Sequence, residues 1–117
     1  MGRLTTHVLD TSAGRPAGGV HVNLYRLTED GREKLCEAST NADGRCDAPL
    51  LEGEKFRIGE YEVEFHVGDY FSAMGVASPE PRFFDVVPIR FGISSIDADY
   101  HVPLLLSPYG YSTYRGS

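Results

Sequence analysis

The sequence predicts an all-β domain, a sandwich of two antiparallel sheets with one short helix, and three observations support this. Apolar and polar residues alternate strictly over residues 61–67 and again over 20–24, which puts one set of side chains on one face of a strand. Turn signals rich in Gly, Asp and Pro separate such runs at spacings of about 8–12 residues, as in sandwiches and barrels. A length of 117 residues fits one domain, residues 1–117, with a core of its own.

Five runs along the chain are predicted as strands: residues 4–9, 20–24, 61–67, 83–93 and 100–106. The dipeptides Asp30-Gly31 and Asp43-Gly44 are hairpin signals, because glycine tolerates the positive φ of tight turns. Arg45 is therefore expected at the start of a strand. Pro103, inside the last run, suggests an edge position or a bulge, because proline has no N–H for a sheet ladder.

One short helix is expected near residues 69–74, between the third and fourth strands. Asp69 is a candidate N-cap, and Gly75 is a candidate stop signal. Residues 77–81 contain two prolines and are expected to form a loop.

The charge balance excludes some classes of partner. The formal net charge is −6, which argues against nucleic acid or an anionic membrane as the main partner. No apolar run approaches the length of about 18 residues that a membrane span needs. The first residues have no apolar core of a signal peptide, so we expect a cytoplasmic protein.

Two cysteines, Cys36 and Cys46, have neither CxxC nor zinc-type spacing. Free thiols in a reducing compartment are the default expectation. A disulfide or a metal site is the alternative.

Three polar side chains stand where a sandwich does not require them. His7 and His101 lie inside predicted strands, opposite the apolar faces, and Arg45 follows a turn glycine. Taken singly, each residue is more commonly a solvated or hydrogen-bonded surface group than a functional one. The residues alone therefore lead to a one-domain sandwich with unexplained histidines.

Other motifs give no sharper assignment. His21 and His66 also lie inside strands, and His66 shares a face with Glu62 and Glu64 that we expect to be solvated. No histidine pair has metal-ligand spacing on one strand. There is no GxSxG nucleophile motif, no Gly-rich phosphate loop and no basic stripe for nucleic acid.

Five blocks, in this order, closely resemble the 5-hydroxyisourate hydrolases, the transthyretin-related enzymes of purine catabolism. The blocks are LTTHVLDT (4–11), TNADGR (40–45), FHVGDYF (65–71), YHVPLLLSP (100–108) and YSTYRGS (111–117). The resemblance covers residues 3–117, and the final Tyr-Arg-Gly-Ser is its most specific mark. One departure is Cys46, where the resemblance leads us to expect an aliphatic residue.

The resemblance implies a transthyretin-like β-sandwich that assembles as a homotetramer, a dimer of dimers. Its active sites would lie in a channel across the dimer–dimer interface, lined by the C-terminal tetrapeptide. The implied reaction is the hydrolysis of 5-hydroxyisourate to 2-oxo-4-hydroxy-4-carboxy-5-ureidoimidazoline in urate degradation. It would need no metal and no organic cofactor.

The resemblance also implies functional residues. The implied catalytic residues are His7, Arg45, His101 and Ser117, and the implied substrate-binding residues are His7, Arg45, Tyr114, Arg115 and Gly116. Histidine suits proton transfer near neutral pH, so we expect His7 and His101 to form a base and proton-shuttle pair. Arg45 would stabilise the oxyanion that forms when water attacks an acyl carbon. Which histidine is the base stays open.

Two other functions are compatible with the same fold. One is a carrier that binds a small aromatic ligand without converting it, although such a carrier would not require this set of histidines and arginines. The other is a structural or adhesion-type sandwich, against which the lack of tandem repeats and of linker sequence argues.

Overall fold

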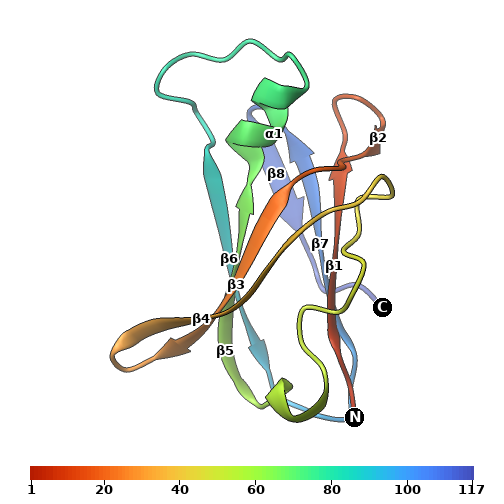
Figure 1. Ribbon diagram of the computed structural model, residues 1–117, viewed down its shortest axis with the longest axis vertical. Coiled ribbons are helices and arrows are strands. Elements are labelled where there is room, and N and C mark those ends of the chain that lie inside the picture. Colours follow the sequence, from red (N-terminus) through yellow and green to blue (C-terminus); the bar gives the residue numbers. More distant parts are fainter.

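The computed structural model describes residues 1–117 as two four-stranded sheets packed face to face, with one short α-helix at one end (Figure 1). The strands are β1 Leu4–Asp10, β2 Arg15–Pro16, β3 His21–Thr28, β4 Gly31–Ser39, β5 Gly59–His66, β6 Val86–Ile93, β7 Tyr100–Ser107 and β8 Gly110–Thr113. A 3₁₀ turn, η1, spans Gly53–Lys55, and the helix α1 spans Val67–Ala73. The predicted two-sheet sandwich is confirmed.

The sheets have the strand orders β2-β1-β7-β8 and β4-β3-β5-β6. Every pair of neighbouring strands is antiparallel except β1 and β7, which run parallel. The first sheet is therefore mixed, whereas the sequence predicted two antiparallel sheets. In that parallel register Thr5 is the partner of His101. The first and last long strands of the chain therefore lie side by side in the middle of one sheet (Figure 1).

Period-two alternation builds the core. Along β1 the residues Leu4, Thr6 and Val8 are buried, whereas Thr5 and His7 are half-buried on the other face. The same alternation buries Tyr61, Val63 and Phe65 of β5 among 21 buried apolar residues. The outward positions of β1 and β7 are therefore available for polar side chains.

The helix differs from the prediction at its start. It begins at Val67, with His66 as an N-cap whose side chain makes no capping bond. Asp69 lies within the first turn, where its Oδ1 accepts from the Arg82 guanidinium at 2.9 Å, so the prediction that Asp69 caps the helix was wrong. Gly75, at φ +78°, follows the helix as expected. None of the helices has the length and apolarity to cross a membrane.

Pro103 lies at neither an edge nor a bulge, contrary to prediction. β7 is flanked by β1 and β8, and no register shift interrupts its pairing. The Pro103 carbonyl accepts from the Thr113 hydroxyl at 2.8 Å, so the polar backbone side of Pro103 faces β8. The continuous ladder between β7 and β8 ends at the pair Leu104 and Thr113, and the next paired residues, His101 and Gly116, form only an isolated bridge. The interruption therefore includes Pro103, the residue that has no N–H.

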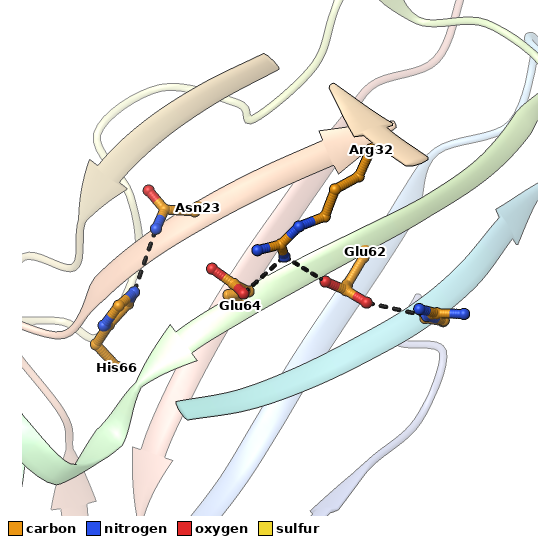
Figure 2. A network of polar contacts seen from close by, with 6 residues as sticks. Asn23, Arg32, Glu62, Glu64 and His66 are labelled. Atoms are coloured by element: carbon orange, nitrogen blue, oxygen red, sulfur yellow. Dashed lines mark hydrogen bonds and ion pairs between the residues drawn. The ribbon is translucent and has the colours of Figure 1, made fainter. Parts of the chain in front are cut away.

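The outer face of β5 is less solvated than the sequence suggests. Arg32 donates to both Glu62 and Glu64 at 2.7 Å, and Arg90 donates to the other oxygen of Glu62 at 2.9 Å. Figure 2 shows Arg32 lying across both carboxylates, with His66 and Asn23 bonded beside them. The Glu62 side chain is 7% exposed, so the expectation of a solvated position was wrong for it. Two guanidinium partners make burial of this carboxylate tolerable.

Asp10, at the end of β1, connects the β2-β1-β7-β8 sheet to the helix α1. Its Oδ2 accepts from the Tyr70 hydroxyl at 2.7 Å, and its Oδ1 accepts from the backbone and hydroxyl of Ser12 and from Ala13 N–H. Burial raises the pKa of Asp10, but the bonds from Ser12, Tyr70 and Ala13 outweigh it, and the pKa lies below its usual 3.8. Burial, followed by the bond to Asp10, raises the pKa of Tyr70 to about 12.

Candidate active site

A cavity of about 480 Å³ opens on the outer face of the β2-β1-β7-β8 sheet. Its lining residues are Arg3, Thr5, His7, Leu9, Arg45, Asp99, His101, Pro103, Tyr114, Gly116 and Ser117. They come from β1, β7, the residue just before each of these strands, the turn after residue 40 and the last residues of the chain. The volume suits a small polar heterocycle, since ligand pockets run from about 300 to 1,000 Å³.

The two histidines predicted to work together share this cavity. His7 is on β1 and His101 is on β7, with ring centroids 6.4 Å apart and ring planes inclined at 36°. Each ring is held by one partner. The Thr5 hydroxyl lies 2.8 Å from His101 Nδ1, and the Asp43 carbonyl lies 3.1 Å from His7 Nε2. Each imidazole therefore keeps a second nitrogen for other partners.

The environment of the histidines favours their neutral forms. Burial, and then the positive charge of Arg45, lowers the pKa of His7 below its usual 6.5. Burial, then Arg45, and then His7 lower the pKa of His101 in the same way. A histidine whose pKa lies below 6.5 is largely unprotonated at pH 7 and can accept a proton. Both rings therefore fit the base that the sequence predicts.

Arg45 reaches the cavity from a turn. The turn crosses beside β1, where Val8 N–H donates to the Gly44 carbonyl at 2.8 Å and His7 bridges to Arg45. A Cβ at Gly44 would lie 2.4 Å from the Val8 carbonyl, and φ there is +76°, so this approach requires glycine. Arg45 makes only an isolated bridge, and the expectation that it starts a strand was wrong.

The last residues of the chain pass over His101. The Gly116 N–H donates to the His101 carbonyl at 2.8 Å. A Cβ at Gly116 would lie 2.6 Å from Cδ2 of the His101 ring. This close contact brings the backbone of Gly116 and Ser117 into the lining of the cavity.

Arg115 alone of the predicted site residues does not line the cavity. Its Cζ lies 4.1 Å from the centroid of the Tyr100 ring, and its guanidinium donates to the Asp99 carbonyl at 3.2 Å. Such a cation–π contact and hydrogen bond hold the side chain against Tyr100 and Asp99. Its neighbour Tyr114 lines the cavity and is 57% exposed.

Sequence reasoning missed three polar residues of the lining, Arg3, Thr5 and Asp99. The sequence did indicate Thr5, because residues two positions apart in a strand, such as Thr5 and His7, face the same side. Arg3 and Asp99 lie just outside the strands and are joined by a bond from Arg3 N–H to Asp99 Oδ1 of 3.1 Å. Only the parallel pairing of β1 and β7 brings these two residues together.

The thiols are free and partly buried. Cys36 Sγ donates to the Leu50 carbonyl at 3.3 Å, and Cys46 follows Arg45 in the chain. Burial raises the pKa of both thiols, and for Cys46 the neighbouring Cys36 adds to the effect. Raised pKa values make the thiolate scarce, so neither is a strong nucleophile. No group of three or more His, Cys, Asp or Glu side chains is arranged to hold a metal ion.

Comparison with known proteins finds similarity over the whole chain. The model of the HIUase/Transthyretin family matches residues 4–116. 5-Hydroxyisourate hydrolase 2 of Rhizobium meliloti (strain 1021) is 61% identical over 116 residues, which cover 99% of this chain and 97% of that protein. The structure of 5-hydroxyisourate hydrolase from Klebsiella pneumoniae matches with a TM-score of 0.83 and 38% identity, and each chain is covered completely. Sea bream transthyretin in complex with thyroxine matches with a TM-score of 0.87 and 30% identity over 97% of this chain and 94% of that chain.

Proposed function

The chain belongs to the HIUase/Transthyretin family, and on that basis we propose that it hydrolyses 5-hydroxyisourate in urate degradation. Its relatives at 61% and 57% identity are 5-hydroxyisourate hydrolases. The observation that carries the proposal is the meeting of two histidines of lowered pKa with Arg45 around one cavity. These are the groups that cofactor-independent hydrolysis of a cyclic amide needs.

The mechanism follows from the properties of these groups. A neutral imidazole, of His7 or His101, takes a proton from water as the water oxygen bonds to a ring acyl carbon. The carbonyl oxygen becomes an oxyanion, and the Arg45 guanidinium stabilises it through charge-assisted hydrogen bonds. The ring C–N bond then breaks, and the imidazolium returns its proton to the leaving nitrogen. Water has thus added OH to carbon and H to nitrogen.

The tail supplies the other contacts of the proposed site. Tyr114, Gly116 and Ser117 line the cavity, where we expect Tyr114 and Gly116 to bind the substrate and Ser117 to orient the water. Arg115 was expected to bind substrate through its side chain. Its contacts with Tyr100 and Asp99 instead favour a role in holding the tail against β7.

Turnover by the wild type and by two variants tests the proposal. 5-Hydroxyisourate is generated in place from urate with urate oxidase, and its ultraviolet decay is followed with and without the protein. We expect faster decay with the wild type and a large loss of kcat in His7→Asn and His101→Asn. Wild-type kcat in both variants would contradict the assignment of the histidines. Decay at the spontaneous rate with a folded wild type would instead favour a carrier.

We also propose a homotetramer, a dimer of dimers, with the cavities at the dimer–dimer interface. Two features support this assembly. β6 and β8 are unpaired sheet edges, and aromatic residues beside them are exposed, with Phe83 at 64%, Tyr109 at 65% and Tyr111 at 41%. Sedimentation equilibrium would reveal the mass, and a monomer at micromolar concentration would refute the proposal.

The free thiols at Cys36 and Cys46 support a reducing compartment such as the cytoplasm. Fractionation of the source cells, with immunodetection of the chain, would check this location. Recovery of the protein outside the cytoplasm would contradict it.

A further inference from the structure

We propose that Asn41 is a positioning residue of the active site, which holds the Asp43–Arg45 turn in the one shape that serves both Arg45 and His7. The inference rests on the proposed hydrolase function. Asn41 does not line the cavity, so it acts through other residues. Its side chain is half-buried at the base of the turn.

The backbone N–H groups of this turn are bonded to Asn41. Its side-chain Oδ1 accepts from Asp43 N–H at 2.9 Å and from Arg45 N–H at 3.2 Å. Its carbonyl accepts from Gly44 N–H at 2.9 Å, and its own N–H donates to the Arg45 carbonyl at 2.7 Å. Three consecutive N–H groups therefore end on one residue. An asparagine side chain bonded to the backbone two residues ahead is a known turn-forming arrangement.

The same three residues make the contacts that shape the site. The Asp43 carbonyl holds the His7 ring at Nε2, 3.1 Å away. The Gly44 carbonyl is bonded to Val8 N–H at 2.8 Å, which docks the turn on β1. Arg45 lines the cavity and lowers the pKa of both histidines. A change in the shape of the turn would therefore reach all three polar groups of the reaction.

The turn has few other supports near its tip. Ala42, Asp43 and Arg45 are exposed, so water can replace the bonds that the Asn41 side chain makes to the backbone. Its other anchors are the Gly44 carbonyl, bonded to Val8 N–H, and Thr40 at the base, whose hydroxyl is bonded to Ala17 and Val20. Loss of the Asn41 side chain should therefore loosen the tip and leave the domain folded. Activity, rather than stability, is the property that depends on it.

Asp47 offers a matched way to test the role of the side chain. Asn41 Nδ2 donates to Asp47 Oδ1 at 2.9 Å. In Asn41→Asp the Oδ1 acceptor stays, but a second carboxylate oxygen faces Asp47 and the two repel each other. Adding Asp47→Asn restores a donor on the other side of the same pair. The exchange N41D/D47N thus keeps every hydrogen bond and reverses only the direction of one.

The experiment measures kcat, KM and melting temperature for the full-length chain and its variants. We expect Asn41→Ala to lower kcat/KM by about 10- to 100-fold, since a catalytic group displaced by about 1 Å can cost about 100-fold. N41D should lose part of this activity, and N41D/D47N should return to within about threefold of wild type. Thr28→Ala is the control, because it removes a turn hydrogen bond, to the Gly31 carbonyl at 3.2 Å, far from the cavity. Its kinetics should match the wild type.

Nuclear magnetic resonance titration of the histidines gives a readout that does not depend on turnover. Burial and Arg45 lower the pKa of His7, whereas the hydrogen bond to the Asp43 carbonyl and the Asp43 charge raise it. Arg45 and Asp43 both lie on the turn, so a loosened turn should shift the His7 titration in N41A, and the exchange variant should restore it. Wild-type kinetics with an unchanged His7 titration in N41A would overturn the proposal. If the wild type itself does not turn over, the hydrolase function fails, and the His7 titration still decides whether Asn41 positions the turn.

Discussion

The hydrogen bond between Thr5 and His101 offers a sharp test of how the site works. Thr5→Val removes the hydroxyl that lies 2.8 Å from His101 Nδ1 and keeps a β-branched side chain of nearly the same shape. Thr5 is half-buried on the outer face of β1, and valine suits a strand. The variant should therefore fold and melt like the wild type. The substitution removes only the hydroxyl that orients the His101 ring and selects its tautomer.

The expected loss follows from the strength of one such bond. A hydrogen bond contributes about 1 kcal/mol net, and leaving a buried group unpaired costs up to about 3 kcal/mol. A factor of ten in rate corresponds to about 1.4 kcal/mol, so the bounds are about 5-fold and 150-fold. His101 is half-buried, and water can replace part of the lost bond. We therefore expect kcat to fall by about 10-fold.

The assay is the decay of 5-hydroxyisourate at saturating and at low substrate, from pH 5 to pH 9. Thr5→Ser is the matched control, because it keeps the hydroxyl and should retain most of the activity. A Thr5→Val enzyme with wild-type kcat across this range would show that the reaction does not need the hydrogen bond from Thr5 to the His101 ring.

Three further predictions concern other parts of the molecule. Arg45→Met should lower kcat/KM by about 10²- to 10³-fold through the lost oxyanion donor; because Arg45 lowers the pKa of His7 and His101, the acid limb of its pH–rate profile should move to higher pH, and an unmoved limb would contradict this. Gly116→Ala places a Cβ 2.6 Å from the His101 ring and should reduce kcat at least 10-fold by the same displacement argument, whereas Gly59→Ala, whose nearest contact is 3.6 Å, should leave the kinetics unchanged. Tyr70→Phe removes the bond to Asp10 and should lower the free energy of unfolding by about 1–3 kcal/mol. Because the folded pKa of Asp10 is below 3.8, the stability that its carboxylate contributes is present above pH 3.8 and is lost as the pH falls further. The free energy of unfolding, measured by urea titration, should therefore change less between pH 7 and pH 3 in Tyr70→Phe than in the wild type.

Local patterns in the sequence predicted the strands well, because a two-residue period reports directly which side of a strand is buried. They predicted less about pairing. Nothing near Leu4 or Tyr100 indicates that β1 and β7 run parallel, since that choice depends on how the whole sandwich closes. Pro103 was misplaced for the same reason: it lies in a central strand, in the interruption between the ladder with β8 and the bridge of His101 and Gly116.

In the site, too, local patterns predicted some residues, whereas others depend on contacts between distant parts of the chain. His7, Arg45 and His101 were found through their family blocks, and the cavity brings them together. Thr5 and Asn41 escaped notice because their roles depend on contacts made after folding. The same is true of Glu62, which reads as a solvated carboxylate until Arg32 and Arg90 close over it. Sequence patterns identify reactive groups more readily than the residues that hold them.

The parts of the site lie on different kinds of structural element. His7 and His101 sit on paired strands, where the ladder fixes the backbone and only the ring orientation remains to be set by Thr5 and Asp43. Proton transfer demands such precision, because it requires contact at hydrogen-bond distance. Arg45 and the tail sit on a turn and on the last residues, whose shapes depend on side-chain bonds from Asn41 and Arg115. In the proposed hydrolase, the groups assigned to proton transfer thus lie on paired strands, and the groups assigned to oxyanion and substrate contacts lie on a turn and on the last residues of the chain.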